Sequence, residues 1–427
     1  MSLLSALSSG TTGLESASME LSVVGDNIAN ANTVGFKAGR AAFQDSLTQA
    51  VIGGSGEIGL GSRLQAVQKI LTQGALTSTG IATDLALQGN GYYVVHGNHN
   101  GQTSNFYTRA GQFTVDKDGY FVNLEGLRVQ GFAADSAGNV SGMPGDLLVG
   151  TASAQPRATQ AITVKANLQS DSVTPALPWD PADPTATSNF STSMTVYDGL
   201  GLAHQTQVFF RNNGGGNWEW HAMTDGATLN PTATGLQEIA GGTLTFDSTG
   251  LLTGVTQASS FAPAGSAAAQ PLTFNFGDPT GAGGTGLGGI TQFAAPSAST
   301  FIGQDGFGSG QLSAIRVDTQ GNIAGIFTNG QTRVLGQVAV ASFAGPDKLE
   351  RIGGNLYAQS QESGQPVVGS PGTGGRASVV SGSLEQSNVD LAEQFVRLIA
   401  AQRAFQANSK TITTADQLLS ELIAMKR

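Results

Sequence analysis

The stretch that decides the fold runs from Ser387 to Arg427 and reads SNVDLAEQFVRLIAAQRAFQANSKTITTADQLLSELIAMKR. It contains no Gly and no Pro, and its larger apolar residues recur at steps of three and four residues or their multiples. These positions are Leu391, Phe395, Leu398, Phe405, Ile412, Leu419 and Ile423. Such spacing is the heptad pattern of a helix that packs along a narrow seam. We therefore predict one continuous helix that needs partners along its length.

The start of this helix carries capping chemistry. Ser387 or Asn388 can accept hydrogen bonds from the free backbone N–H groups of the first turn, and Asp390 suits the positive end of the helix dipole. Glu393 and Arg397 are spaced to form an ion pair, which predicts a solvent-facing flank.

A second helix with the same spacing is predicted at the beginning of the chain. Its seam positions are Leu3, Leu7, Gly10, Leu14, Ala17, Leu21, Val24 and Ile28. The small residues Gly10 and Ala17 permit close approach of a neighbouring helix. The two helices can pair within one chain as an antiparallel coiled coil, or they can pack between copies of the chain. The spacing does not decide between these arrangements.

Composition excludes several classes of function. The 427 residues carry a formal net charge of −10 and only 12% charged residues, which argues against nucleic acid or an anionic membrane as partner. The chain has no Cys, so it can form neither a disulfide nor a thiolate metal site. We also expect no cleaved signal peptide and no membrane insertion, because no apolar run approaches the length of a membrane span.

Catalytic and cofactor motifs are not recognised in this sequence. We expect no enzyme activity, no cofactor and no metal site, because no phosphate-binding or dinucleotide-binding glycine motif follows a strand and opens a helix. The four histidines are interpreted as scattered surface residues; they are His96, His99, His204 and His221.

The region between the helices is rich in short alternating runs. Runs such as Tyr92–Val95 and Phe190–Tyr197 predict strands, and 60 Gly residues suit the many turns that join them. We expect a mainly β chain with terminal α-helices and two nested all-β modules. The predicted division is 1–38 and 385–427 for a terminal helical domain, 39–74 and 366–384 for an extended connector, 75–155 and 303–365 for an inner β-domain, and 156–302 for an inserted outer β-domain.

A four-residue pattern with Asp first and Gly fourth recurs between apolar runs. It starts at Asp116, Asp135, Asp247 and Asp318. Such a pattern is typical of tight turns, because the carboxylate accepts local N–H groups and Gly takes permissive dihedral angles. The functional alternative is a calcium loop, but its twelfth position after Asp116 would be Leu127. We therefore favour hairpin turns.

Two further segments resemble a known family. The run Asn27-Ile-Ala-Asn-Ala-Asn-Thr-Val-Gly-Phe-Lys37 resembles the N-terminal signature of the bacterial flagellar rod and hook proteins, and Gly382–Ser409 looks like the matching C-terminal signature. The phrases Gly89–Val95, Tyr107–Phe113 and Gly325–Phe343 resemble the inner β-domain of that family. The signature residues are Asn27, Asn30, Asn32, Gly35, Phe36 and Lys37.

The resemblance implies a subunit that is exported through the flagellar type III apparatus without a cleaved signal. It also implies polymerisation into a tube of the extracellular flagellum, with the terminal helices innermost. The apolar seam residues of both helices would then make the contacts of self-assembly. They are Leu7, Leu14, Leu21, Val24, Ile28, Leu391, Phe395, Leu398, Phe405, Ile412, Leu419 and Ile423. The implied partners are further copies of the chain in a helical homopolymer, the distal rod protein, the hook cap and the hook-filament junction proteins.

The large insertion at 156–302 favours the hook members of this family, because distal rod proteins of the family lack it. A distal rod protein with an unusual insertion remains the alternative within the family. A secreted adhesin or glycan-binding β-protein is the alternative outside it, with Trp179, Trp218 and Trp220 as a possible sugar platform.

Overall fold

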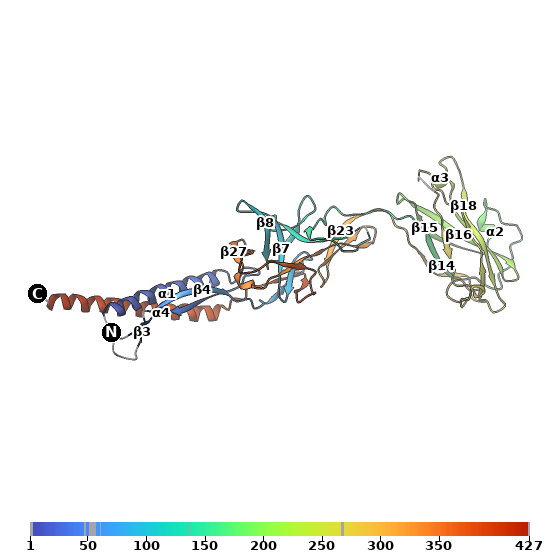
Figure 1. The fold of residues 1–427 in the computed structure, drawn as a ribbon. Coiled ribbons are helices and arrows are strands. Elements are labelled where there is room, and N and C mark those ends of the chain that lie inside the picture. The colour runs from blue at the N-terminus through green and yellow to red at the C-terminus, as the bar shows by residue number, and fades with distance from the viewer. Residues whose placement is uncertain are drawn as a thin grey trace. The chain divides into compact units, whose positions relative to one another are not determined.

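The structure is a computed structural model that describes residues 3–46, 48–50, 57–59, 61–135, 137–265 and 269–425. It is mainly β with a long helix at each end of the chain, as the sequence predicts (Figure 1). The chain forms two compact units. Unit 1 comprises Met1–Ala152, Ser313–Ile326 and Thr332–Arg427, and unit 2 comprises Ser153–Leu312 and Phe327–Gln331.

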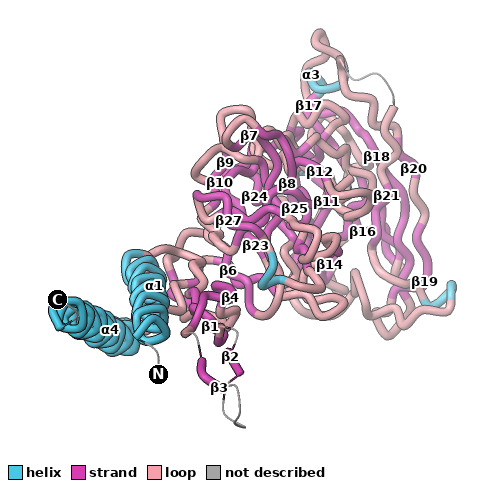
Figure 2. Tube along the Cα trace, turned by 60° about the vertical axis from the view of Figure 1, so that its left-hand side comes forward, coloured by secondary structure: helices cyan, strands magenta, loops and turns pink. Residues whose placement is uncertain are grey.

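The two terminal helices of unit 1 pack against one another. Helix α1 spans Leu3–Ala29 and helix α4 spans Leu391–Met425. Gly10 contacts Ile412, and the amide of Asn27 donates to Gln394, so the helices run antiparallel. Figure 2 shows α1 and α4 lying side by side. Of the two arrangements that the spacing left open, the pairing within one chain is the one that the structure contains.

The first turn of α4 is capped by Asp390. Its Oδ1 accepts from the backbone N–H groups of Ala392 at 2.8 Å and Glu393 at 3.2 Å. Asn388, one of the two caps expected from the sequence, instead uses its side chain to bind segments that lie far away along the chain. The expected pair of Glu393 with Arg397 is present at 2.7 Å.

The segment after α1 folds into a long hairpin that lies against this helix. Strand β1 (Gly39–Asp45) pairs antiparallel with β4 (Ser62–Lys69), and both strands contact α1. The short strands β2 (Thr48–Ala50) and β3 (Glu57–Gly59) pair with one another farther along the hairpin. Residues 51–56 of the expected extended connector lie outside the described residues.

The β-module of unit 1 is built from both halves of the chain. Its first strands are β5 (Leu76–Ser78), β6 (Leu85–Gln88), β7 (Tyr92–His99), β8 (Gln102–Thr108), β9 (Phe113–Val115), β10 (Phe121–Asn123), β11 (Arg128–Ala133) and β12 (Gly145–Asp146). Its later elements are β25 (Thr332–Val338), β26 (Val340–Ser342), the 3-10 turn η2 (Pro346–Lys348), β27 (Glu350–Gly353), β28 (Leu356–Ala358), β29 (Val367–Gly369), β30 (Ser378–Ser381) and β31 (Ser383–Glu385). Strands β23 (Gly310–Val317) and β24 (Asn322–Phe327) cross the boundary between the units.

Pairing between these two sets closes the module. Strand β7 pairs with β26, β8 with β28, and β11 with β25. Nearer the helices, β6 pairs with β30 and β5 with β31. Every one of these pairings joins strands that are more than 180 residues apart along the chain, so the module cannot close until the C-terminal segments have returned to it.

Unit 2 contains two sheets that share one core. The larger sheet has the order β15 (Phe190–Tyr197), β16 (Ala203–Gly214), β17 (Asn217–Asp225), β18 (Leu236–Phe246), β19 (Leu252–Val255), with β20 (Ala258–Ser259) paired to β18. The smaller sheet has β14 (Ala161–Asn167) between β21 (Thr273–Asn275) and β22 (Ala298–Gln304). The remaining elements are β13 (Ser153–Ala154), the single-turn helices α2 (Pro184–Thr187) and α3 (Gly226–Leu229), and the 3-10 turn η1 (Thr280–Ala282).

Aromatic side chains fill the core of unit 2. Trp218 and Trp220 are both 0% exposed and pack in one cluster with Phe274. They cannot form a sugar platform on the surface, so that part of the glycan-binding alternative is wrong. Trp179 instead stacks on the ring of His221, with 4.0 Å between the ring centroids.

The histidine interpretation also needs correction. His204 is buried, and its Nε2 lies 3.1 Å from Oδ2 of Asp198. Nothing in the sequence indicated this pairing, because no local pattern links a lone histidine to a carboxylate six residues earlier.

The four Asp-x-x-Gly segments form the predicted turns. In each of them the Asp Oδ1 accepts a backbone N–H two residues later, as Asp116 does from Asp118, and the Gly takes a positive φ. Asp198-Gly-Leu-Gly201 forms a fifth such turn, with φ of 86° at Gly201, and the sequence analysis missed it.

Candidate assembly site

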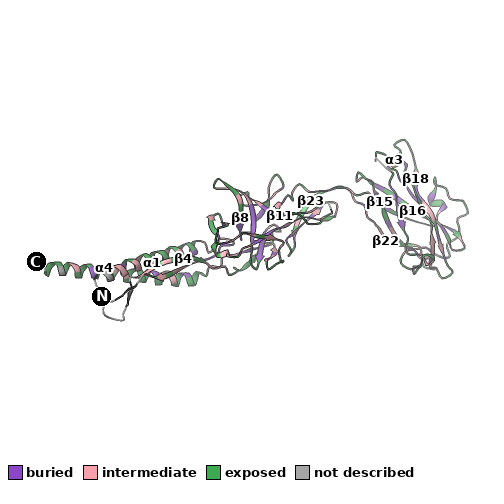
Figure 3. Cartoon of the chain, in the orientation of Figure 1, coloured by how far each residue is buried: buried purple, intermediate pink, exposed green. Residues whose placement is uncertain are grey.

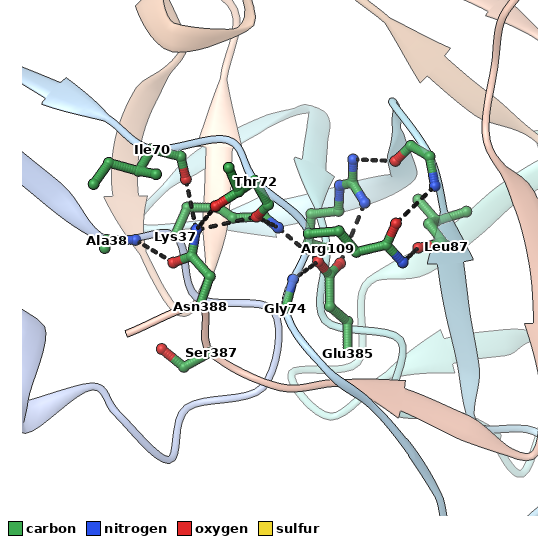
Figure 4. Close-up of polar contacts among 12 residues, drawn as sticks. Lys37, Ala38, Ile70, Thr72, Gly74, Leu87, Arg109, Glu385, Ser387 and Asn388 are labelled. Atoms are coloured by element: carbon green, nitrogen blue, oxygen red, sulfur yellow. Dashed lines mark hydrogen bonds and ion pairs between the residues drawn. The ribbon is translucent and has the colours of Figure 1, made fainter. Parts of the chain in front are cut away.

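The signature segment that follows α1 lies directly against the segment that precedes α4. The backbone N–H of Gly35 donates to the carbonyl of Glu385 at 2.7 Å. Two residues later, Nζ of Lys37 lies 2.6 Å from Oε1 of Glu385. Figure 4 shows Lys37 and Arg109 on the two sides of the Glu385 carboxylate. The two signatures, at opposite ends of the sequence, thus form one buried contact.

A cluster of three charged side chains lies at the centre of this contact, and we call Lys37, Arg109 and Glu385 the ion cluster. Nη1 of Arg109 donates to Oε2 of Glu385 at 3.2 Å, and the backbone N–H of Gly74 donates to Oε1 at 3.0 Å. The exposed fractions are 3% for Lys37, 5% for Arg109 and 0% for Glu385. Burial lowers the pKa of Lys37, and its bond to Glu385 works against this shift.

Two side-chain amides extend the contact on either side of the ion cluster. Oδ1 of Asn388 accepts from the N–H of Ala38 at 2.8 Å, and its Nδ2 donates to the carbonyls of Ile70 and Thr72. Asn27 bonds both the N–H and the carbonyl of Gly39, each at 2.8 Å. These amides satisfy backbone N–H and C=O groups of Ala38, Gly39, Ile70 and Thr72.

The signature glycine is required by both conformation and space. Gly35 has a φ of 71°, a region that favours Gly. A Cβ at this position would lie 2.6 Å from the backbone carbonyl carbon of Arg109. Any larger residue would therefore push the signature segment away from the β-module.

The other signature residues differ in their environments. Phe36 is buried beneath the guanidinium of Arg351, which lies 4.9 Å from the ring centroid. Asn30 bonds the carbonyl of Asp26 and accepts from Thr33, so it closes the end of α1. Asn32 is exposed. Most of the signature therefore lies in the junction between the helix pair and the β-module.

Sequence reasoning did not assign Arg109 or Glu385 to a site. Both lie inside phrases that resemble the family, but nothing in their local spacing links them to Lys37. The only available signal was that Arg109 is the one charged residue of Tyr107–Phe113 and Glu385 the one charged residue of Gly382–Val389, in a chain with few charges.

The apolar positions of α4 differ in how far they are exposed. The face toward α1 buries Gln394, Ala401 and Ala415, and it half-buries Leu398, Ile412 and Leu419. A second set of apolar residues is exposed, and we call it the α4 stripe. It comprises Leu391, Phe395, Val396, Ile399, Phe405, Leu418, Ile423 and Met425. Figure 3 shows exposed residues along the whole of α4.

The predicted seam residues therefore divide into an exposed group and a buried or half-buried group. Leu391, Phe395, Phe405 and Ile423 belong to the α4 stripe, with exposed fractions from 41% to 67%. On α1, Val24 is buried, and Leu7, Leu14, Leu21 and Ile28 are half-buried. The pairing face of α4 contains smaller and more polar residues than the spacing of large apolar residues indicates.

The described residues contain no group of three or more His, Cys, Asp or Glu side chains that could hold a metal ion. Among the same residues, no helix combines the length and the apolar character that crossing a membrane requires.

Known proteins resemble the chain along its whole length. Four family descriptions match: "Flagella basal body rod protein" at residues 7–37, "Flagellar hook protein FlgE/F/G D1 domain" at 86–176, "Flagellar basal body protein FlaE D2 domain" at 167–307, and "Flagellar basal body rod FlgEFG protein C-terminal" at 380–425.

Individual relatives agree with these matches. The chain is 34% identical to the flagellar hook protein FlgE of Treponema pallidum, over 100% of both chains. It is 32% identical to the flagellar hook protein FlgE of Escherichia coli, over 99% of this chain and 100% of the other. Among solved structures, Helicobacter pylori flagellar hook protein FlgE2 aligns with a TM-score of 0.47 and 15% identity, over 73% of this chain and 100% of the other. The chain is therefore a structural, non-enzymatic hook subunit that belongs to the flagellar hook protein FlgE family.

Proposed function

We propose that this subunit assembles with copies of itself into a curved, flexible tube that joins the rod of the basal body to the filament and transmits motor torque. The observation that carries the proposal is the α4 stripe. Helix α4 already has a partner in α1, yet eight of its large apolar side chains remain exposed. A large amount of exposed apolar surface is typical of protein interaction sites.

The energy available from this stripe suits a repeated contact. Full burial of a large apolar side chain contributes about 1.5–3 kcal/mol, so a half-exposed residue of the stripe has roughly 1 kcal/mol left to gain. Phe395 is 52% exposed and Val396 is 68% exposed. Because each subunit of a polymer repeats the contact, several such gains can support assembly without any charged pair.

The ion cluster supports a role in carrying load. Lys37 lies between α1 and β1, whereas Glu385 ends β31 and Arg109 follows β8, both in the β-module. A force on the helix pair therefore reaches the β-module through the buried bond of Lys37 to Glu385 as well as through the chain itself. This arrangement is suited to a subunit whose inner and outer parts must rotate together.

Membership of the family supports a proposal about the export route of the chain and about its partners. We infer export through the flagellar type III apparatus without removal of an N-terminal segment. We also infer end contacts with the distal rod protein, the hook cap and the hook-filament junction proteins. The seam and stripe residues of α1 and α4 would make the contacts between copies.

The direct test is to supply the tagged chain to a bacterium that lacks its own hook protein. Immunogold electron microscopy should label curved tubes between the rod and the filament, and intact mass should show an unprocessed chain. Label on the rod within the cell envelope would favour the distal rod alternative, and label elsewhere on the cell surface would contradict both assignments.

A further inference from the structure

A cavity of about 280 Å³ lies beside the ion cluster. Lys37 and Arg109 line it together with Asn90, Tyr92, Ser342 and Phe343. One water occupies about 30 Å³, so the cavity has room for a small hydrated ion. Its lining joins two buried cations to neutral polar and aromatic groups.

The charges around this cavity do not balance. Lys37 and Arg109 carry two positive charges, and the one carboxylate that bonds with them among the described residues is that of Glu385. Their other acceptors are neutral, since Lys37 donates to the carbonyl of Thr72 and Arg109 to the carbonyl of Gly89. Both oxygens of Glu385 are already in use, since Oε1 accepts from Lys37 and Gly74 and Oε2 accepts from Arg109. A buried cation without a counter-ion is unfavourable, because it has lost the solvation of water.

Two further observations support this imbalance. Nε of Arg109 is buried and has no hydrogen-bond partner among the described residues. The nearby acidic residue Asp347 does not replace the missing charge, because its side chain is 44% exposed and lies 4.0 Å from Lys348. One positive charge beside the cavity therefore lacks a bonded carboxylate among the described residues.

We propose that this cavity is a binding site for one oxyanion, either a carboxylate or a free inorganic phosphate or sulfate. Arg109 and Lys37 would supply the positive charge, and Asn90 and Ser342 would supply neutral polar groups at the wall. A guanidinium holds its N–H groups in a fixed fork that matches two oxygens of a carboxylate or of a phosphate, which an ammonium does not. The carboxylate could come from a neighbouring copy of the chain, and the free anion from solution.

The test uses the monomer of the full chain and inorganic phosphate as the probe. Isothermal titration at constant ionic strength, adjusted with chloride, should show saturable binding of one phosphate. Asn90→Asp places a carboxylate at the cavity wall without removing any member of the ion cluster. It should weaken phosphate binding by about tenfold or more, because like charges repel in a poorly solvated site.

The matched control is Asn98→Asp. Asn98 is exposed on β7, and its Oδ1 accepts from the N–H of Gly101, which an aspartate can also do. This variant should bind phosphate like the wild type. Absence of saturable phosphate binding to the wild type, or equal binding by Asn90→Asp and the wild type, would overturn the proposal.

A second arm identifies the source of the oxyanion and rests on the proposed function. If a carboxylate of a neighbouring copy fills the cavity, saturating phosphate and the Asn90→Asp change should each raise the critical concentration for assembly. If the site takes the free ion, neither should alter assembly. A chain that does not assemble at all would refute the proposed function, while the phosphate titration of the monomer would still decide the oxyanion site.

Discussion

The substitution Glu385→Gln tests whether the ion cluster holds the helix pair to the β-module. The change keeps the shape of the side chain and removes one negative charge. Lys37 and Arg109 then lose the carboxylate that lies 2.6 Å and 3.2 Å from them. Both cations remain largely buried, so neither regains the solvation of bulk water.

The size of the effect follows from this burial. Removing one partner of a buried ion pair costs about 3–5 kcal/mol, because an uncompensated charge is left behind. For a unit of this size, each kcal/mol lowers the melting temperature by about 2–4 °C, so the expected decrease is roughly 6–20 °C. The same chemical change at Glu393 should cost less than about 1 kcal/mol, because that ion pair is exposed.

Hydrogen exchange on the monomer shows which part of the chain loses stability in Glu385→Gln. The N–H groups of Gly35 and Gly74 donate to the carbonyl and the carboxylate of Glu385, and both should lose protection in Glu385→Gln. The amide of Trp220, in the core of unit 2, serves as an internal reference and should not change. Glu393→Gln is the matched control on α4 and should leave all three amides as in the wild type.

Two outcomes would refute the reasoning. If Glu385→Gln melts within a degree of the wild type and keeps both glycine amides protected, the ion cluster contributes no net stability. If protection is lost equally in both units, the substitution has acted on global stability rather than on the junction.

Two further predictions follow from the structure. Burial raises the pKa of Tyr92 from 10.0 to about 12, and it also raises the pKa values of Tyr93 and Tyr357. The stability that these neutral phenols contribute should therefore be present below pH 10 and lost between about pH 10 and 12. Burial lowers the pKa values of Lys37 and Lys69, so their deprotonation raises the stability of the folded chain as the pH approaches 10.5 and cannot cause a loss of stability above that pH. Urea denaturation at a series of pH values, followed with tyrosinate absorbance, measures the change in stability. Constant or rising stability above pH 10 would contradict the prediction. Replacing residues 158–306 by a two-residue Asn-Gly turn should leave unit 1 folded, because the backbones of Arg157 and Phe307 already exchange two hydrogen bonds of 2.9 Å and can close as a hairpin. Circular dichroism and hydrogen exchange on the truncated chain would measure this, and loss of protection at Tyr93 would show that unit 1 needs the excised residues.

The helices and most strands could be predicted because their residues repeat with a local period. The spacing on α4 indicated a helix, and Tyr92–Val95 indicated a strand, without reference to any distant residue. The Asp-x-x-Gly turns were predictable for the same reason, since the aspartate and the N–H groups that it accepts lie within four residues.

The junction could not be predicted, because its contacts join distant segments. Lys37 and Glu385 are 348 residues apart in sequence, and no local pattern encodes their distance in space. The pairing face of α4 was also hard to infer. Gly10 and Gly13 of α1 leave room for Ile412 and Asn408, and the buried apolar positions of α4 are Ala401 and Ala415, whereas the prediction followed the large apolar residues.

The central claim is that the α4 stripe makes contacts between copies of the chain, and Phe405→Asp tests this claim most directly. Phe405 is 41% exposed in the monomer, so the substitution should leave the melting temperature of the monomer close to that of the wild type. In a polymer it would bury an unpaired carboxylate, which costs several kcal/mol.

The measurement is the critical concentration for assembly, followed by sedimentation and electron microscopy, with Glu393→Gln as the control that should assemble normally. We predict an increase of roughly a thousandfold for Phe405→Asp, at tenfold per 1.4 kcal/mol. If Phe405→Asp instead lowers the melting temperature of the monomer by many degrees and assembles at the wild-type concentration, α4 serves only the core of its own chain, and the assembly role of the stripe is wrong.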